Sequence, residues 1–296
     1  MNHVVRTFTS IWKMSNIASN PMRGKPVAIR FVTGPFEAVG RYRSLTMELS
    51  KREVLGRYRD ASFGLLWSLI SPFLMLMVYT FAFGSVMKAR WPPTDGGNHH
   101  FAIILFIGLI VHGFFSECFT RAPTLITSNV SYVKRVVFPL EILPWQVMLS
   151  ALFHAVMNLV VFALLVITLE GSIDWTFFLV PLVFLPLIFI CLGVSWLFSA
   201  IGVYLRDISQ ISGVLSTAML FMSSALVPVK TLSPTYQAIF ALNPLTFIID
   251  QARQVTLSNQ LPDWSGLFWY SVGGLLFMCI GYAWFMATRK GFADVL

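Results

Sequence analysis

Six long apolar stretches, each about 20 residues or more, dominate this sequence. They are Leu66–Lys88, Phe101–Thr120, Trp145–Leu169, Phe177–Val203, Ile208–Pro228 and Gly266–Ala287. An α-helix needs about 20 apolar residues to cross a hydrocarbon layer ~30 Å thick. Because lipid offers no hydrogen bonds, the backbone inside it must satisfy its own, which favours helices. The pattern therefore predicts an all-α integral membrane protein with six transmembrane helices.

The composition supports this class. Hydrophobic residues make up 56% of the chain and charged residues only 11%, against about 25% charged in ordinary soluble domains. The three cysteines lie in three different apolar stretches and form no CxxC motif. We therefore expect neither a disulfide framework nor a metal site.

The basic residues predict the orientation in the membrane. Eleven of the 21 Lys and Arg residues precede Leu66. With six spans and a cytoplasmic N-terminus, 17 of the 21 fall on the inner side, as the positive-inside rule requires. Both termini are therefore expected in the cytoplasm. The net charge of +8 is read as a topology signal and a contact with membrane lipids, not as a nucleic-acid surface.

The segment between the fifth and sixth stretches does not fit a simple crossing. It holds two short apolar runs, Tyr236–Leu242 and Leu245–Ile249, separated by Asn243-Pro244. A full crossing here would move the basic residues near the C-terminus to the outer side. We therefore expect a re-entrant hairpin over about 230–263 that enters from the outer face.

The break in this hairpin is a candidate outer gate. Asn243 suits the N-cap of a helix that begins at Pro244. Asp250 and Arg253 are one turn apart and could pair. A simple surface pair is the alternative interpretation of these two residues.

Upstream of the first span, Leu45, Leu49 and Val54 recur among basic residues at loosely helical spacing. This spacing predicts an amphipathic interface helix over 45–65 that lies among the lipid headgroups; a solvated basic tail is the alternative. Its interface residues would be Arg52, Arg57, Tyr58 and Arg59. Residues 1–44 would form a cytoplasmic extension and residues 66–296 the membrane domain.

Several of these segments resemble one family. The matching segments are Arg57–Trp67 with Pro72 and Tyr79–Gly84, then Val133–Pro144, Ser199–Ile208, Leu242–Leu245 with Arg253, and Arg289–Leu296. Together they are similar to the membrane subunit of bacterial ABC exporters for polysaccharides, in the O-antigen, teichoic-acid and capsule branch. The likeness extends over about residues 45–296. It departs at Ser223–Pro228, where a Ser-Pro…Tyr-Pro pattern is expected.

The resemblance implies a function. The chain would be the channel-forming permease subunit, working as a homodimer with two copies of a separate ATPase in the bacterial inner membrane. The substrate would be a polysaccharide on a polyprenyl-diphosphate lipid, moved from cytoplasm to periplasm during lipopolysaccharide biosynthesis. The sequence has no G-x-x-x-x-G-K-[ST] phosphate loop. We therefore expect no enzyme activity and no cofactor in this chain, with ATP and Mg bound by the partner.

Two cytoplasmic connections are available to receive the ATPase's movement. The first, about 121–143, has room for one or two helical turns and contributes Asn129, Lys134 and Arg135 as candidate docking residues. The second is the turn with Arg206 and Asp207. Ordinary inner-side charge is the alternative interpretation of Lys134 and Arg135.

Aromatic residues are candidates for the lining of a pathway, because sugar rings stack on aromatic faces. The candidates are Phe73, Tyr79, Phe83, Phe114, Phe115 and Phe119. Packing between helices or against lipid is the alternative for each of them.

Ionisable residues within the spans are few, which disfavours an ion-driven carrier. Glu117 precedes Arg121 by four residues and predicts a salt bridge, while His112 and His154 are expected to be packed or hydrogen-bonded. Two other functions stay open: an ABC permease for teichoic acid, capsule, lipid or drug, and a membrane enzyme acting on polyprenyl lipids. The enzyme would need clustered acids, which this sequence lacks.

Overall fold

A computed structural model describes residues 27–82, 101–134 and 138–296, and every regular element in these ranges is helical. The longer helices are α2 (Val27–Arg41), α3 (Arg43–Tyr58), α4 (Trp67–Tyr79), α5 (Phe101–Arg121), α7 (Leu143–Glu170), α8 (Val180–Tyr204), α9 (Ile208–Phe221), α10 (Pro234–Ala241), α11 (Pro244–Thr256) and α12 (Trp264–Thr288). Short turns join them: η2 (Gly64–Leu66), η4 (Ala122–Thr124), η5 (Thr127–Asn129), α6 (Val130–Val133), η6 (Leu140–Ile142), η7 (Trp175–Leu179), η8 (Val229–Thr231), η9 (Arg289–Gly291) and α13 (Phe292–Val295). The all-α class is confirmed.

Five helical segments in the described ranges are long and apolar enough to cross a membrane. They are Gly64–Ala82, Phe101–Thr124, Leu140–Glu170, Trp175–Tyr204 and Trp264–Val295. The expected fifth span, Ile208–Pro228, is helical only over the 14 residues of α9. At 1.5 Å per residue α9 is about 21 Å long, short of the hydrocarbon thickness. The chain is thus a multi-pass membrane protein, and the sixth crossing stays a prediction.

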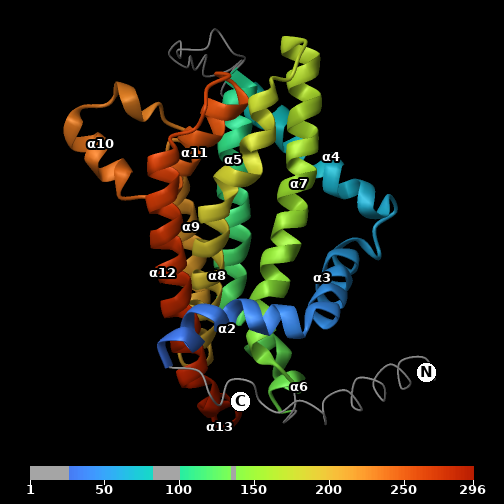
Figure 1. The fold of residues 1–296 in the computed structure, drawn as a ribbon. Coiled ribbons are helices and arrows are strands. Elements are labelled where there is room, and N and C mark those ends of the chain that lie inside the picture. Colours follow the sequence, from blue (N-terminus) through green and yellow to red (C-terminus); the bar gives the residue numbers. More distant parts are fainter. Residues whose placement is uncertain (1–26, 83–100, 135–137) are drawn as a thin grey trace.

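The helices form one bundle around α5 (Figure 1). Helices α7, α8, α9 and α11 pack against α5, and α12 packs against α8. One end of the bundle carries α2, α3, α6 and α13, and the other carries α10. We call these the α6 end and the α10 end. Both candidate docking connections lie at the α6 end and the predicted hairpin at the α10 end, as the charge pattern requires.

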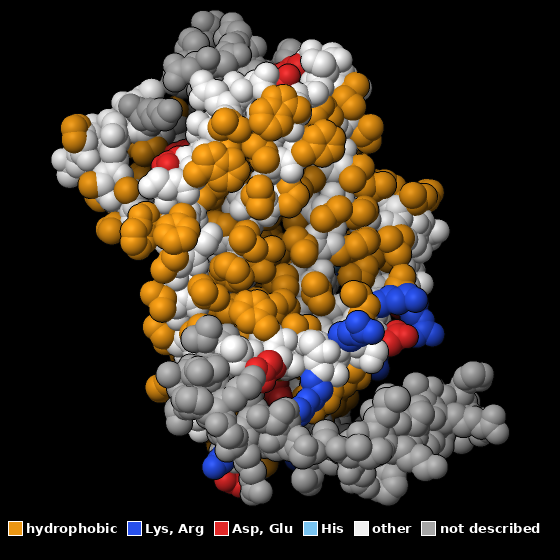
Figure 2. All heavy atoms as spheres, in the orientation of Figure 1, with side chains coloured by type: hydrophobic (Ala, Val, Ile, Leu, Met, Phe, Trp, Pro, Cys, Tyr) orange, Lys and Arg blue, Asp and Glu red, His pale blue; other side chains and the backbone are white. Residues whose placement is uncertain are grey.

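Helix α5 is the best-buried span, while the first span lies at the periphery. Of the 18 most apolar consecutive residues in each span, 72% are buried in Phe101–Thr124 but only 11% in Gly64–Ala82. Exposed apolar side chains cover the middle of the face in Figure 2, and charged side chains gather toward its ends. This distribution suits a surface in contact with lipid.

Glycines allow α8 and α12 to approach closely. Gly281 faces the backbone of Gly193, and a Cβ built at Gly274 would lie 2.9 Å from the carbonyl oxygen of Pro186. Small residues at helix crossings let backbones pack tightly, which is how membrane helices associate without a hydrophobic driving force. This contact fixes the last span against the fourth.

The segment before the first span forms two helices at the α6 end. Helix α2 lies across the bundle, where the indole N–H of Trp145 donates to the carbonyl of Pro35 at 3.2 Å. Helix α3 packs against α7, and its fully buried side chains are Thr46, Ser50 and Val54. The inward face therefore combines two small polar side chains with Val54, whereas Leu45 and Leu49 are only partly buried. The headgroup location of this helix stays a prediction.

Candidate functional site

An ionic network connects α3, α5 and α7 at the α6 end. Glu117 on α5 accepts hydrogen bonds from Arg57 of α3 at 2.5 Å and from Arg121 at 3.2 Å. Its second oxygen lies 3.1 Å from Nδ1 of His154 on α7. Arg121 also pairs with Glu53 on α3. The four charged side chains compensate one another, so the network can hold charge at this end of the apolar bundle.

The sequence predicted part of this network. The Glu117–Arg121 pair and a hydrogen-bonded His154 are confirmed. The contribution of Arg57 and Glu53 was missed, because Arg57 lies 60 positions before its partner Glu117 and no local spacing relates α3 to α5. His112 is also hydrogen-bonded, to the carbonyl of Ser216 at 3.0 Å.

The four predicted interface residues have different surroundings. Arg57 belongs to the network, and Tyr58 lies beside His154 with ring centroids 6.0 Å apart. Partial burial raises the pKa of Tyr58 above its usual value. Arg59 is exposed just after α3. Arg52 is exposed on the helix and lines a pocket.

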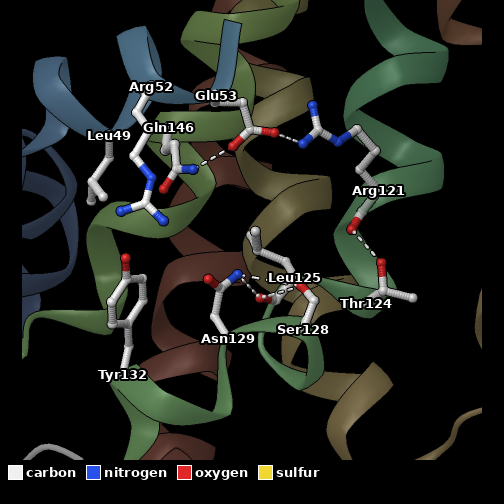
Figure 3. Close-up of a pocket in the computed structure, with 10 residues that line it drawn as sticks. All are labelled: Leu49, Arg52, Glu53, Arg121, Thr124, Leu125, Ser128, Asn129, Tyr132 and Gln146. Carbon is white, nitrogen blue, oxygen red and sulfur yellow. Dashed lines mark hydrogen bonds and ion pairs between the residues drawn. The ribbon is translucent and has the colours of Figure 1, made fainter. Parts of the chain in front are cut away.

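This polar pocket lies between α3, the connection after α5, and α7 (Figure 3). It has a volume of about 290 Å³. Its lining is Leu49, Arg52, Glu53, Arg121, Thr124, Leu125, Ser128, Asn129, Tyr132 and Gln146. The Gln146 amide donates to Glu53. We refer to this site as the polar pocket.

The docking candidates occupy the surface of the same end. The first connection forms η5 and α6, the one or two helical turns that the sequence predicts. The Asn129 amide donates to the carbonyl of Leu125 at 2.8 Å, which fixes this turn. Lys134 is exposed, as are Arg206 and Asp207 in the second connection. Arg135 lies outside the described residues.

The C-terminal tail joins these two connections, which sequence patterns did not indicate. Arg289 pairs with Glu141 at 2.6 Å and donates to the carbonyl of Phe138 at 3.2 Å. Phe292 is fully buried and packs near Tyr204, with ring centroids 6.2 Å apart. Arg289 is therefore engaged in a contact between the tail and the first connection.

The aromatic candidates do not gather in one cavity. Tyr79 lines a crevice of about 410 Å³ among α4, α5 and α7. Phe115 and Phe119 line a groove of about 530 Å³ with side chains from α8, α9 and α12. Phe114 is buried against Phe184, at 5.9 Å between ring centroids. Phe73 is 45% exposed on the outer face of α4, and Phe83 lies outside the described residues.

The break at Asn243-Pro244 separates α10 from α11, as predicted. The side-chain oxygen Oδ1 of Asn243 accepts from the backbone N–H of Leu245 at 3.0 Å, so the expected N-cap is confirmed. Its amide also donates to the carbonyls of Met219 and Met222, at 2.7 and 3.0 Å. Asn243 therefore caps the end of α9 as well as the start of α11.

Arg253 completes this arrangement from inside the protein. Its side chain is 12% exposed and lies 3.9 Å from Asp250, which matches the predicted pair. The guanidinium donates to the carbonyls of Ile104 at 3.1 Å, Ser224 at 2.6 Å and Ala225 at 3.0 Å. Two of these carbonyls follow the end of α9. Arg253 thus supplies hydrogen bonds where the helix is interrupted.

The apolar bundle carries two connections at one end and an interrupted helix at the other. This arrangement is typical of the membrane subunit of a transporter. The ABC-2 type transporter family matches residues 44–257, and the chain belongs to this family. It is the membrane permease subunit of an ABC exporter, and membership implies an ATPase partner subunit.

Among known proteins, this chain is similar to O-antigen export permeases. Over 255 residues the chain is 26% identical to the O-antigen export system permease protein RfbA of Myxococcus xanthus, covering 86% of this chain and 95% of that protein. Two RfbA permeases of Klebsiella pneumoniae are 23% and 24% identical, covering 85% of this chain and 95% of each relative. The recognised resemblance to O-antigen export permeases is confirmed.

Proposed function

We propose that this chain is the transmembrane subunit of an ATP-driven exporter that moves lipid-linked, O-antigen-like polysaccharide from cytoplasm to periplasm. Two copies would form the channel in the bacterial inner membrane, with two ATPase subunits that bind ATP and Mg. The observation that carries this proposal is the similarity to RfbA permeases over 85–86% of the chain.

The arrangement of the α6 end supports ATPase docking there. Lys134, Arg206 and Asp207 are exposed, and the tail connects their two segments through Arg289 and Phe292. A force applied to either connection would therefore reach α8 and α12 together. Both termini would be cytoplasmic, and α9 with the residues that follow it would form the fifth of six crossings.

A gene deletion tests the exporter function. Loss of this chain should abolish polysaccharide on the cell surface and cause lipid-linked glycan to accumulate inside, and a plasmid copy should restore display. Surface polysaccharide is measured by immunoblot of intact cells. Normal display together with changed drug resistance or lipid composition would instead favour a drug or lipid permease.

Cysteine labelling tests the topology. In a background without Cys118, Cys191 and Cys279, single cysteines at Ser172 and Gln260 should react with an impermeant maleimide from outside. A cysteine at Ser131, in α6, should react only after permeabilisation. External labelling at Ser131 would reverse the predicted orientation.

A further inference from the structure

The polar pocket contains two hydrogen-bond donors that have no partner among the residues the structure describes. The Arg52 guanidinium extends into the pocket (Figure 3) and forms no hydrogen bond or ion pair with any described residue. The Tyr132 hydroxyl points toward the same space and is equally without a partner among the described residues. The Tyr132 ring is held by stacking on Phe138, with centroids 4.3 Å apart and planes at 11°. The Arg52 guanidinium and the Tyr132 hydroxyl thus both point into the polar pocket.

The pocket also contains an unused acceptor. Because the Gln146 amide N–H group donates to Glu53, its carbonyl oxygen faces away from that carboxylate. This oxygen is buried and has no hydrogen-bond partner among the described residues. A buried acceptor without a donor destabilises the folded protein, because it has lost its hydrogen bonds to water. A ligand that offers a hydroxyl beside an anionic group would satisfy both kinds of site.

The charges around the pocket favour an anion at Arg52. Glu53 is already paired with Arg121, and Glu117 with Arg57 and Arg121. Arg52 is therefore the cation of the lining whose charge is not compensated. A guanidinium offers several N–H groups in a planar fork that matches phosphate oxygens. The volume of about 290 Å³ is near the lower limit of small-molecule sites, about 300 Å³.

We propose that the polar pocket binds a phosphorylated sugar, with the phosphate on Arg52 and Tyr132 and a sugar hydroxyl on the Gln146 oxygen. The same chemistry occurs in a free sugar phosphate and at the junction between lipid diphosphate and the first sugar of a lipid-linked glycan. That the ligand is a lipid-linked glycan rests on the proposed function. The pocket would hold that junction beside the ATPase docking surface.

Binding to the purified permease without its ATPase tests this site. Isothermal titration with glucose 1-phosphate, pyrophosphate and glucose should rank affinity in that order. Arg52→Gln should weaken glucose 1-phosphate binding about tenfold or more, because it removes a charge-assisted contact, and Tyr132→Phe should weaken it less. Lys51→Gln is the matched control: it removes one positive charge from the adjacent exposed position of α3 and should leave binding unchanged.

Three results would overturn the proposal. The first is no binding of glucose 1-phosphate by the wild type, and the second is an equal loss of affinity in Arg52→Gln and Lys51→Gln. The third is that Arg52→Gln binds glucose 1-phosphate as the wild type does but no longer co-purifies with the ATPase. The last result would assign Arg52 to a partner's carboxylate. A polyprenyl-diphosphate-linked sugar in mixed micelles can be added as a competitor of glucose 1-phosphate. If it displaces glucose 1-phosphate at a lower concentration than that of glucose 1-phosphate itself, the natural ligand is the lipid-linked sugar. Because export in cells is measured separately, a failed binding test with intact export refutes this site alone.

Discussion

The two ends of the bundle use charged and polar side chains in opposite ways. At the α6 end, Glu117 and Arg121 of α5 bond mainly to Arg57 and Glu53 of α3 and to each other. At the α10 end, Arg253 and Asn243 bond to backbone carbonyls around the end of α9. Paired side chains can exchange partners, whereas a carbonyl left by an interrupted helix has no alternative inside a membrane protein. We therefore expect the α10 end to be the more rigid.

The largest effect should follow from Arg253→Met. It removes donors to three carbonyls, and each hydrogen bond that involves a charged group contributes about 1.5–3 kcal/mol. We expect most of the protein to be lost from the folded fraction, measured by size-exclusion chromatography in detergent. Arg206→Met, at an exposed position, is the control. A stable Arg253→Met protein would contradict the rigid role of this end.

A smaller loss is expected for Glu117→Gln. The change leaves Arg57, Arg121 and His154 without their shared anion, but Arg57 is 41% exposed and water can replace part of the interaction. We expect about 1–3 kcal/mol, measured as a lower melting temperature. The double variant Glu117→Gln with Arg57→Gln should recover part of this loss. Additive losses would show that the two residues are not coupled.

Asn243→Ala should cost about 1–2 kcal/mol, because it removes an N-cap and two bonds to the end of α9. Ser233 offers a matched control, since it occupies the N-cap position of α10 without a side-chain hydrogen bond to the helix. Ser233→Ala should therefore leave the melting temperature unchanged. Equal shifts in the two variants would contradict a special role for Asn243.

The smallest stability effect is expected for Lys134→Glu, an exposed residue at the α6 end. Its free energy of unfolding should change by less than about 0.5 kcal/mol, which is checked from the melting temperature. If the first connection docks the ATPase, co-purification of the partner should nevertheless fall. Arg59→Glu, also exposed but next to α3, should retain the partner. Full co-purification by Lys134→Glu would remove this side chain from the docking surface.

Local patterns were sufficient for several elements. Apolar length predicted the helices later found as α5, α7, α8 and α12, because the hydrocarbon thickness acts on each segment separately. The Asn243-Pro244 pair predicted a helix break and an N-cap, both of which depend on adjacent residues. The pairs Glu117–Arg121 and Asp250–Arg253 followed from helical spacing alone.

Contacts between distant segments were decided only by the tertiary structure. Arg253 looked like a group beside an exit, but the packing of α11 against α5 directs it to the carbonyls of Ile104, Ser224 and Ala225. The spacing of Leu45, Leu49 and Val54 did not indicate that Thr46 and Ser50 would be buried with Val54, because the packing of α3 against α7 decides this. The physical reason is that a sequence fixes spacing within one helix, whereas the direction of a side chain toward another helix depends on how the whole bundle packs.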